Sequence, residues 1–121
     1  MQKKRVMPFN EKLNDRVREA LAELPDVEEK YMFGGVCYMV NDKMCVGVVG
    51  DQLMCRVGEE HLEALQERPG CEQMRMKGRP MKAYVLVSEQ GMLTSSDFRF
   101  WIDTCLAFNP HAKAADKRKR K

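Results

Sequence analysis

The sequence predicts an α+β fold in which an antiparallel sheet packs with three helices, in the order helix, three strands, helix, two strands, helix. The strongest observation is residues 31–57, where valine, tyrosine, cysteine and methionine crowd the strand positions. Within it, Asn41-Asp42 and Gly50-Asp51 tolerate the positive φ of two-residue hairpin turns. Segments with apolar residues at helical spacing flank this region. At 121 residues, the chain is long enough for one domain with its own core.

Three helices are predicted from apolar spacing and from end signals. The first spans residues 10–24, with Asn10 as the N-cap and Pro25 just past its end. A short second helix spans residues 59–67. The closing helix is predicted to be capped by Thr94, Ser95 or Ser96. Its apolar stripe consists of Phe98, Trp101, Ile102, Cys105 and Phe108.

Strand structure is predicted from about Val27 to Val57 and again at residues 72–77 and 82–88. The later pair is joined by a turn at residues 78–80. Inside the first region, Gly34-Gly35 is predicted to form a bend or bulge and not a third hairpin turn, because glycine inside a strand pattern is typical of such bends.

Two-residue turns predict that Met39 pairs with Met44 and that Val48 pairs with Leu53. The core face of the sheet would then carry Cys37, Met39, Met44, Val46, Val48, Leu53, Cys55 and Val57. The opposite face would carry Tyr38, Val40, Lys43, Cys45, Val49, Gln52, Met54 and Arg56. A slip of one residue would exchange the two sets. Because this second face is also apolar, we expect the last helix or a second copy of the chain to cover it, with a homodimer surface around Tyr38, Val49 and Met54.

The chain divides by charge into a basic N-terminal arm at residues 1–9, a folded domain at residues 10–109 and a disordered basic tail at residues 110–121. The formal charge of +3 comes from the two ends, and the body between them is net negative. A nucleic-acid-binding domain built around a basic face would show the reverse distribution. No signal peptide and no long apolar run are recognisable, so a cytoplasmic location without membrane contact is expected.

Several motifs resemble the N-terminal domain of the TfoX family of competence regulators. These are Met32-Phe33-Gly34-Gly35 followed by the hairpins of residues 36–57, the second hairpin with Lys77-Gly78-Arg79, and the closing helix with its internal tryptophan. The similarity spans roughly residues 10–108. It implies a secretion-chaperone-like α+β fold, frequent homodimers, and involvement in regulation and not in catalysis. The competence regulators also carry a C-terminal domain, where this sequence has the basic tail.

No catalytic, cofactor-binding or metal-binding pattern is recognisable in the sequence. His61 and His111 are far apart, and neither lies beside a cysteine or serine signature. The five cysteines show no CxxC or Cys/His spacing and are predicted to be reduced core residues. We therefore predict a non-enzymatic protein-interaction or regulatory module that uses no cofactor and binds an unknown protein partner.

The alternative hypothesis is an auxiliary nucleic-acid-binding protein that uses its basic termini. Candidate polyanion contacts lie in the segment 74–82, where basic residues alternate with methionine, and in the tail. They are Arg75, Lys77, Arg79, Lys82, Lys117, Arg118, Lys119, Arg120 and Lys121. The basic residues of segment 74–82 also fit an ordinary charged edge hairpin. The basic residues of the tail also fit a solubilising end. With no aromatic residue interleaved in the tail, its binding should be weak, sequence-independent and sensitive to salt.

Deletion of residues 113–121 tests the tail, because it removes six basic side chains and Asp116. We expect the melting temperature to stay nearly unchanged and the salt dependence of any DNA binding to flatten, since that slope counts the phosphates neutralised. Fluorescence anisotropy of a labelled duplex at two salt concentrations measures this. Equal binding by the full chain and the deletion variant would contradict the assignment and place the contacts on the folded body.

Overall fold

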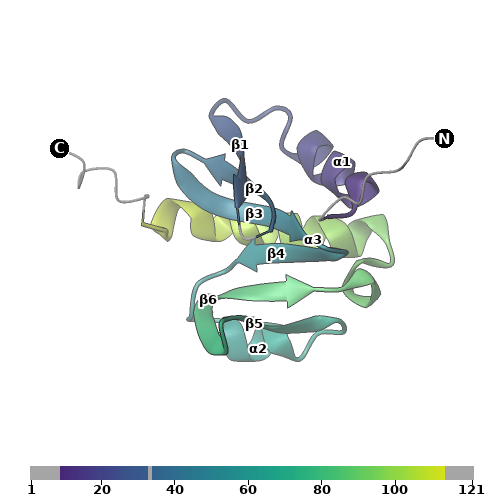
Figure 1. The fold of residues 1–121 in the computed structure, drawn as a ribbon, viewed down its shortest axis with the longest axis vertical. Coiled ribbons are helices and arrows are strands. Elements are labelled where there is room, and N and C mark those ends of the chain that lie inside the picture. Colours follow the sequence, from purple (N-terminus) through teal and green to yellow (C-terminus); the bar gives the residue numbers. More distant parts are fainter. Residues whose placement is uncertain (1–8, 33, 114–121) are drawn as a thin grey trace.

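The computed structural model describes residues 9–32 and 34–113. Within these residues the chain forms one six-stranded antiparallel sheet and three α-helices (Figure 1). The helices are α1 (Glu11–Ala20), α2 (Leu62–Gln66) and α3 (Ser95–Phe108). The strands are β1 (Val27–Met32), β2 (Gly35–Val40), β3 (Lys43–Val49), β4 (Gln52–Arg56), β5 (Cys71–Met76) and β6 (Arg79–Val87), in the spatial order β1-β2-β3-β4-β6-β5. Two 3-10 turns, η1 (Glu89–Met92) and η2 (Asn109–His111), flank α3. The predicted α+β class is confirmed.

One strand was missed in the predicted order. β1 pairs with β2 from Val27↔Val40 to Met32↔Gly35, so the chain reverses direction between these two strands. Gly34 lies in this reversal with φ of +74°. The prediction of a bend or bulge at Gly34-Gly35 was therefore wrong, and four strands precede α2 instead of three. β1 is an edge strand with several exposed polar residues, so its apolar alternation is too weak to be separated from that of β2.

The predicted pairs Met39↔Met44 and Val48↔Leu53 are confirmed. Between them, however, the register of β2 and β3 shifts, because Tyr38 pairs with Val46 while Met39 pairs with Met44. Cys45 is the extra residue of this β-bulge, and it lies in the same core cluster as the adjacent Val46.

The bulge overturns part of the predicted division into faces. Tyr38, Val40 and Cys45 belong to the cluster beneath the helices, although the sequence placed them on the opposite face. Cys37 and Met44 were predicted to face the helices and lie in the other cluster. The reason is that one inserted residue changes the alternation of a strand, so a uniform two-residue period is correct on only one side of the bulge.

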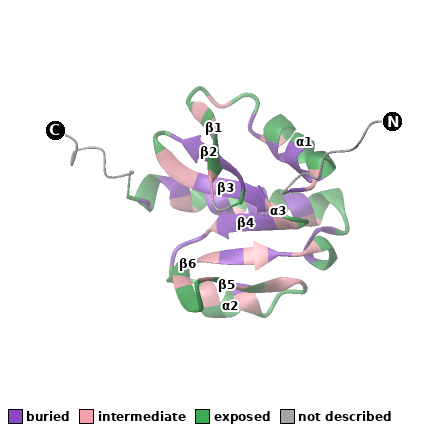
Figure 2. Ribbon diagram, in the orientation of Figure 1, coloured by how far each residue is buried: buried purple, intermediate pink, exposed green. Residues whose placement is uncertain are grey.

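The helices pack into one cluster on one face of the sheet, which contains Leu13 and Val17 of α1, Leu65 of α2, and Trp101 and Ile102 of α3. Figure 2 shows the buried residues gathered on β2, β3 and β4 and on α3. The two buried polar side chains among the described residues, Asn14 and Asn109, are both hydrogen-bonded. The cluster beneath the helices is thus apolar, and both buried asparagines are satisfied.

The helix caps agree with the sequence, since Asn10 accepts a hydrogen bond from the Leu13 amide and Thr94 accepts one from the Asp97 amide. The predicted domain boundaries lie slightly inside the folded body. Phe9, assigned to the arm, is 6% exposed and forms a bridge with Gly50, and Ala112, assigned to the tail, is buried. The rest of the predicted arm and residues 114–121 of the predicted tail lie outside the described residues.

Replacement of Trp101 by alanine tests the packing of α3. Trp101 is 1% exposed and contacts Phe100 edge to face, with ring centroids 5.1 Å apart. Trp101→Ala should lower the free energy of unfolding by about 3–5 kcal/mol, measured by urea denaturation. Arg99→Ala, on the exposed side of the same helix, serves as the control and should cost less than about 1 kcal/mol. A Trp101→Ala variant as stable as the parent would show that α3 does not close the core.

Candidate functional site

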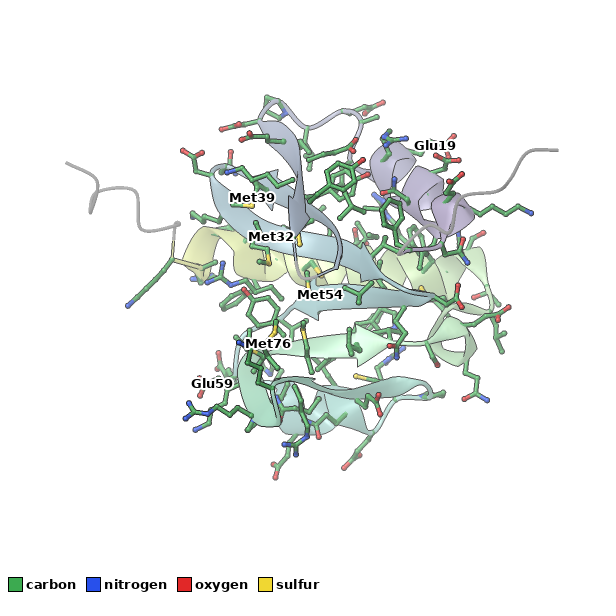
Figure 3. All side chains as sticks on the ribbon, in the orientation of Figure 1. Glu19, Met32, Met39, Met54, Glu59 and Met76 are labelled. Carbon is green, nitrogen blue, oxygen red and sulfur yellow. The ribbon has the colours of Figure 1, made fainter. Side chains whose placement is uncertain are left out.

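The face of the sheet opposite the helices carries a second apolar cluster, which we call the methionine face. Its buried residues are Cys37, Met54 and Met74. Its partly buried residues are Met32, Met44, Val49, Met76, Met81, Tyr84 and Leu86. All of these residues come from the six strands, and none from the described helices. In Figure 3 the side chains of Met32, Met54 and Met76 lie one after another across the sheet. Methionine repacks easily, so such a surface suits contact with another protein.

One row of residues crosses all six strands on this face. Directly opposed residues of antiparallel strands share a face, and the pairing links them in the order Lys30, Cys37, Gly47, Met54, Leu86 and Glu72. The middle of the row is apolar and close-packed. Its two ends are the exposed side chains of Lys30 on edge strand β1 and Glu72 on edge strand β5. This row therefore ends in opposite charges on opposite edges of the sheet.

Gly47 and Met54 form the centre of this row. A Cβ atom at Gly47 would lie 2.6 Å from the Val36 carbonyl oxygen and 2.9 Å from the Met54 Cε. The glycine thus leaves space that the Met54 side chain fills by lying across β3, and Met54 is only 1% exposed. The other partly buried residues of the face surround this closed centre and supply its accessible surface.

Arg56 brings a positive charge to one end of the methionine face, opposite Tyr84. Its Nη1 donates a hydrogen bond of 3.2 Å to the Met44 carbonyl, and its guanidinium lies over the Tyr84 ring, 5.7 Å from the centroid. Its Nε is buried without a hydrogen-bond partner among the described residues. Burial raises the pKa of Tyr84, and the Arg56 charge partly offsets this effect. The phenol therefore stays neutral, and Arg56 is held by packing and by one carbonyl.

The five cysteines, all within the described part of the chain, are free thiols. Burial raises the pKa of Cys37 and of Cys71 to about 11. A hydrogen bond with Cys105, together with burial, raises the pKa of Cys45, and burial raises that of Cys105 well above its usual value. Because the thiolate is the nucleophile, these environments disfavour covalent chemistry at the four thiols. The prediction that the cysteines are core residues is confirmed for the four that are buried, whereas Cys71 is half-buried.

The three residues predicted for a dimer surface do not lie together. Tyr38 faces the helices, where its hydroxyl donates a 2.6 Å hydrogen bond to Asn14 and its pKa is raised to about 12, mainly by burial. Val49 and Met54 both belong to the methionine face. Met44 of this face was assigned to the helix side because the bulge was not predicted, and no face was predicted for the residues of β1, β5 and β6.

The predicted polyanion contacts are also separated. Arg75, Lys77 and Arg79 are exposed around the turn that joins β5 to β6. Lys82 instead lines a shallow depression shared with Glu59 and Glu63, which would repel a polyanion. The tail contacts Lys117, Arg118, Lys119, Arg120 and Lys121 lie outside the described residues.

The two histidines, which the sequence separates by fifty positions, line one pocket between α2 and the end of α3. No sequence signal indicated this meeting. Within the described residues, no group of three or more histidine, cysteine or acidic side chains is placed to hold a metal ion. None of the described helices has both the length and the apolar character needed to cross a membrane.

These features define a small α+β domain with one face of its antiparallel sheet covered by helices and the other lined with methionine. The model of the TfoX N-terminal domain family matches residues 19–109, which is more than half of the chain. The protein belongs to the TfoX N-terminal domain family, and the resemblance noted in the sequence is confirmed. No curated protein and no solved structure matches the chain.

Substitution of Gly47 by alanine tests the closed centre of the methionine face. The added methyl group would overlap the Val36 carbonyl, which belongs to the backbone and cannot rotate away. We expect Gly47→Ala to lower the free energy of unfolding by about 1–3 kcal/mol in urea denaturation. Unchanged stability would contradict the close approach of β2, β3 and Met54.

Proposed function

We propose that the protein is a non-enzymatic interaction module with a regulatory role, and that the methionine face is its contact surface. The observation that carries this proposal is an apolar cluster, rich in methionine, on the sheet face to which none of the described helices contributes a residue. Membership of the TfoX family supports a regulatory role and not a metabolic one. Free cysteines throughout the domain are typical of a reducing compartment, so a cytoplasmic location is part of the proposal.

The environment of the candidate nucleophiles supports a non-enzymatic role. Thiols with raised pKa values are poor nucleophiles at neutral pH. The hydroxyl of Thr104, which lines the pocket with the histidines, donates a 2.7 Å hydrogen bond to the Phe100 carbonyl. Its proton is thus engaged by the backbone of α3 and is not directed to a histidine base.

The occupant that we propose for the methionine face is a second copy of the chain. A two-fold axis parallel to the strands would place β1 of one copy over β5 of the other, since these strands are the two edges of the sheet. Lys30 of each copy would then meet Glu72 of the other copy at both ends of the apolar row. This charge complementarity favours a homodimer over an unrelated partner, and the flexible methionines would fill the contact between the copies.

Charge reversal tests this arrangement. Lys30→Glu or Glu72→Lys alone would create two like-charge contacts in the dimer, and each should weaken dimerisation about tenfold in sedimentation velocity at micromolar concentration. The double variant exchanges the charges and should restore the affinity of the parent. Glu63→Lys, on α2 and away from the methionine face, is the matched control and should dimerise normally.

Two outcomes would contradict the dimer. A parent protein that stays monomeric over the whole concentration range would exclude a second copy as the occupant. A double variant that dimerises as poorly as either single variant would exclude the Lys30 and Glu72 contact. The melting temperature of the parent and of each variant is also measured, so that a folding defect is distinguished from a loss of dimerisation.

A further inference from the structure

The pocket between α2 and α3 is a second candidate site, separate from the methionine face. It has a volume of about 600 Å³, within the range of small-molecule sites. Its lining combines an apolar floor with polar groups and consists of Val57, Glu60, His61, Leu65, Thr104, Ala107, Phe108 and His111. Val57 and Leu65 belong to the core cluster on the helix side of the sheet. A ligand could therefore bind here while the methionine face is in contact with another molecule.

The Phe108 ring is held at this pocket by a close approach of the backbone. Gly58, with φ of +82°, lies so near the ring that a Cβ there would be 2.5 Å from the Phe108 Cε1. His111 lies beside the same ring, with centroids 6.4 Å apart. The loop before α2 and the turn after α3 thus hold an aromatic face and an imidazole together, in an arrangement suited to a flat or cationic ligand.

The polar groups of the pocket include several hydrogen-bond acceptors. Among the described residues that line it, Glu60 is the acidic one, and its carboxylate lies 4.0 Å from the His61 Nε2. His61 occupies the N-cap position of α2 without a side-chain capping bond, so its imidazole is not engaged by the helix. Thr104 donates its proton to a backbone carbonyl and leaves only its oxygen lone pair as an acceptor. No lysine or arginine is among these lining residues.

From this chemistry we propose that the pocket binds a small organic ammonium ion with a flat apolar body. The ammonium group would lie between Glu60 and the imidazoles, whose ring nitrogens can accept its hydrogen bonds. The body would pack on Leu65, Ala107 and the face of Phe108. An anion of the same shape meets the Glu60 carboxylate and is rejected.

Two probes of matched shape and opposite charge test the proposal with the full chain. Phenethylammonium and phenylacetate are titrated separately while the NMR resonances of His61 and His111 are followed. Phenethylammonium should bind with a dissociation constant of about 1 mM, as expected for a fragment of this size. Phenylacetate should shift neither histidine at the same concentration. Equal binding of the two probes, or no binding of phenethylammonium up to about ten times that concentration, would overturn the proposal.

Variants identify the groups responsible. Glu60→Gln should weaken phenethylammonium binding about fivefold, as expected for loss of an exposed ion pair. Glu67→Gln, at the other end of α2 and outside the pocket, is the matched control and should bind as the parent does. If Glu60→Gln binds as tightly as the parent, the carboxylate does not select the cation and the proposal fails.

A variant that ends at Lys113 distinguishes binding of a free amine from binding of the protein's own basic side chains. The proposal expects the same affinity with and without residues 114–121. If removal of these residues strengthened phenethylammonium binding tenfold, the pocket would be occupied by the cationic side chains of the tail. That result would overturn the assignment of the pocket to a small free amine.

Discussion

The β-bulge at Cys45 is the local constraint on which the arrangement of both faces depends. It inserts one residue between the Tyr38↔Val46 and Met39↔Met44 pairs. On one side of the bulge, Tyr38 turns towards α1 and gives its hydroxyl to Asn14. On the other side, Met44 turns away from the helices and joins Cys37 and Met54. Without the inserted residue, the Tyr38 side chain would lie on the methionine face and would lose its hydrogen bond to Asn14.

The opposite face shows how a sheet can be apolar on both sides and still fold as one domain. Its centre is closed within the chain itself, because the missing side chain of Gly47 admits Met54 across β3. Around this centre, methionines at the two ends of the sheet stay partly accessible, and the edges carry Lys30 and Glu72. The outer methionines are flexible and Lys30 and Glu72 carry opposite charges, so the methionine face of one copy is able to contact that of a second copy. The proposed dimer uses these properties and requires no change in the fold.

The pocket and the methionine face lie on different layers of the molecule. The pocket is built from the helix layer, where α2 is short and the end of α3 continues into η2 beside it. The methionine face is built from strands alone. Because the two share no residue, a ligand in the pocket and a partner on the sheet would compete for no contact. Any coupling between them would have to pass through the core that joins α3 to β3 and β4.

The sequence by itself determined the fold class, the cap at Asn10 and the burial of Trp101, and its motifs showed the resemblance to the family. The fold class, the cap and the burial follow from local periodicity and turn chemistry, which act over a few residues. Only the tertiary structure decided that Val27–Met32 is a separate strand, that Tyr38 lies on the helix side and Cys37 on the methionine face, that Thr94 is the cap of α3, and that His61 and His111 line one pocket. The physical reason is that a single inserted residue reverses the alternation of a strand, and that segments distant in sequence meet only through the packing of the whole chain.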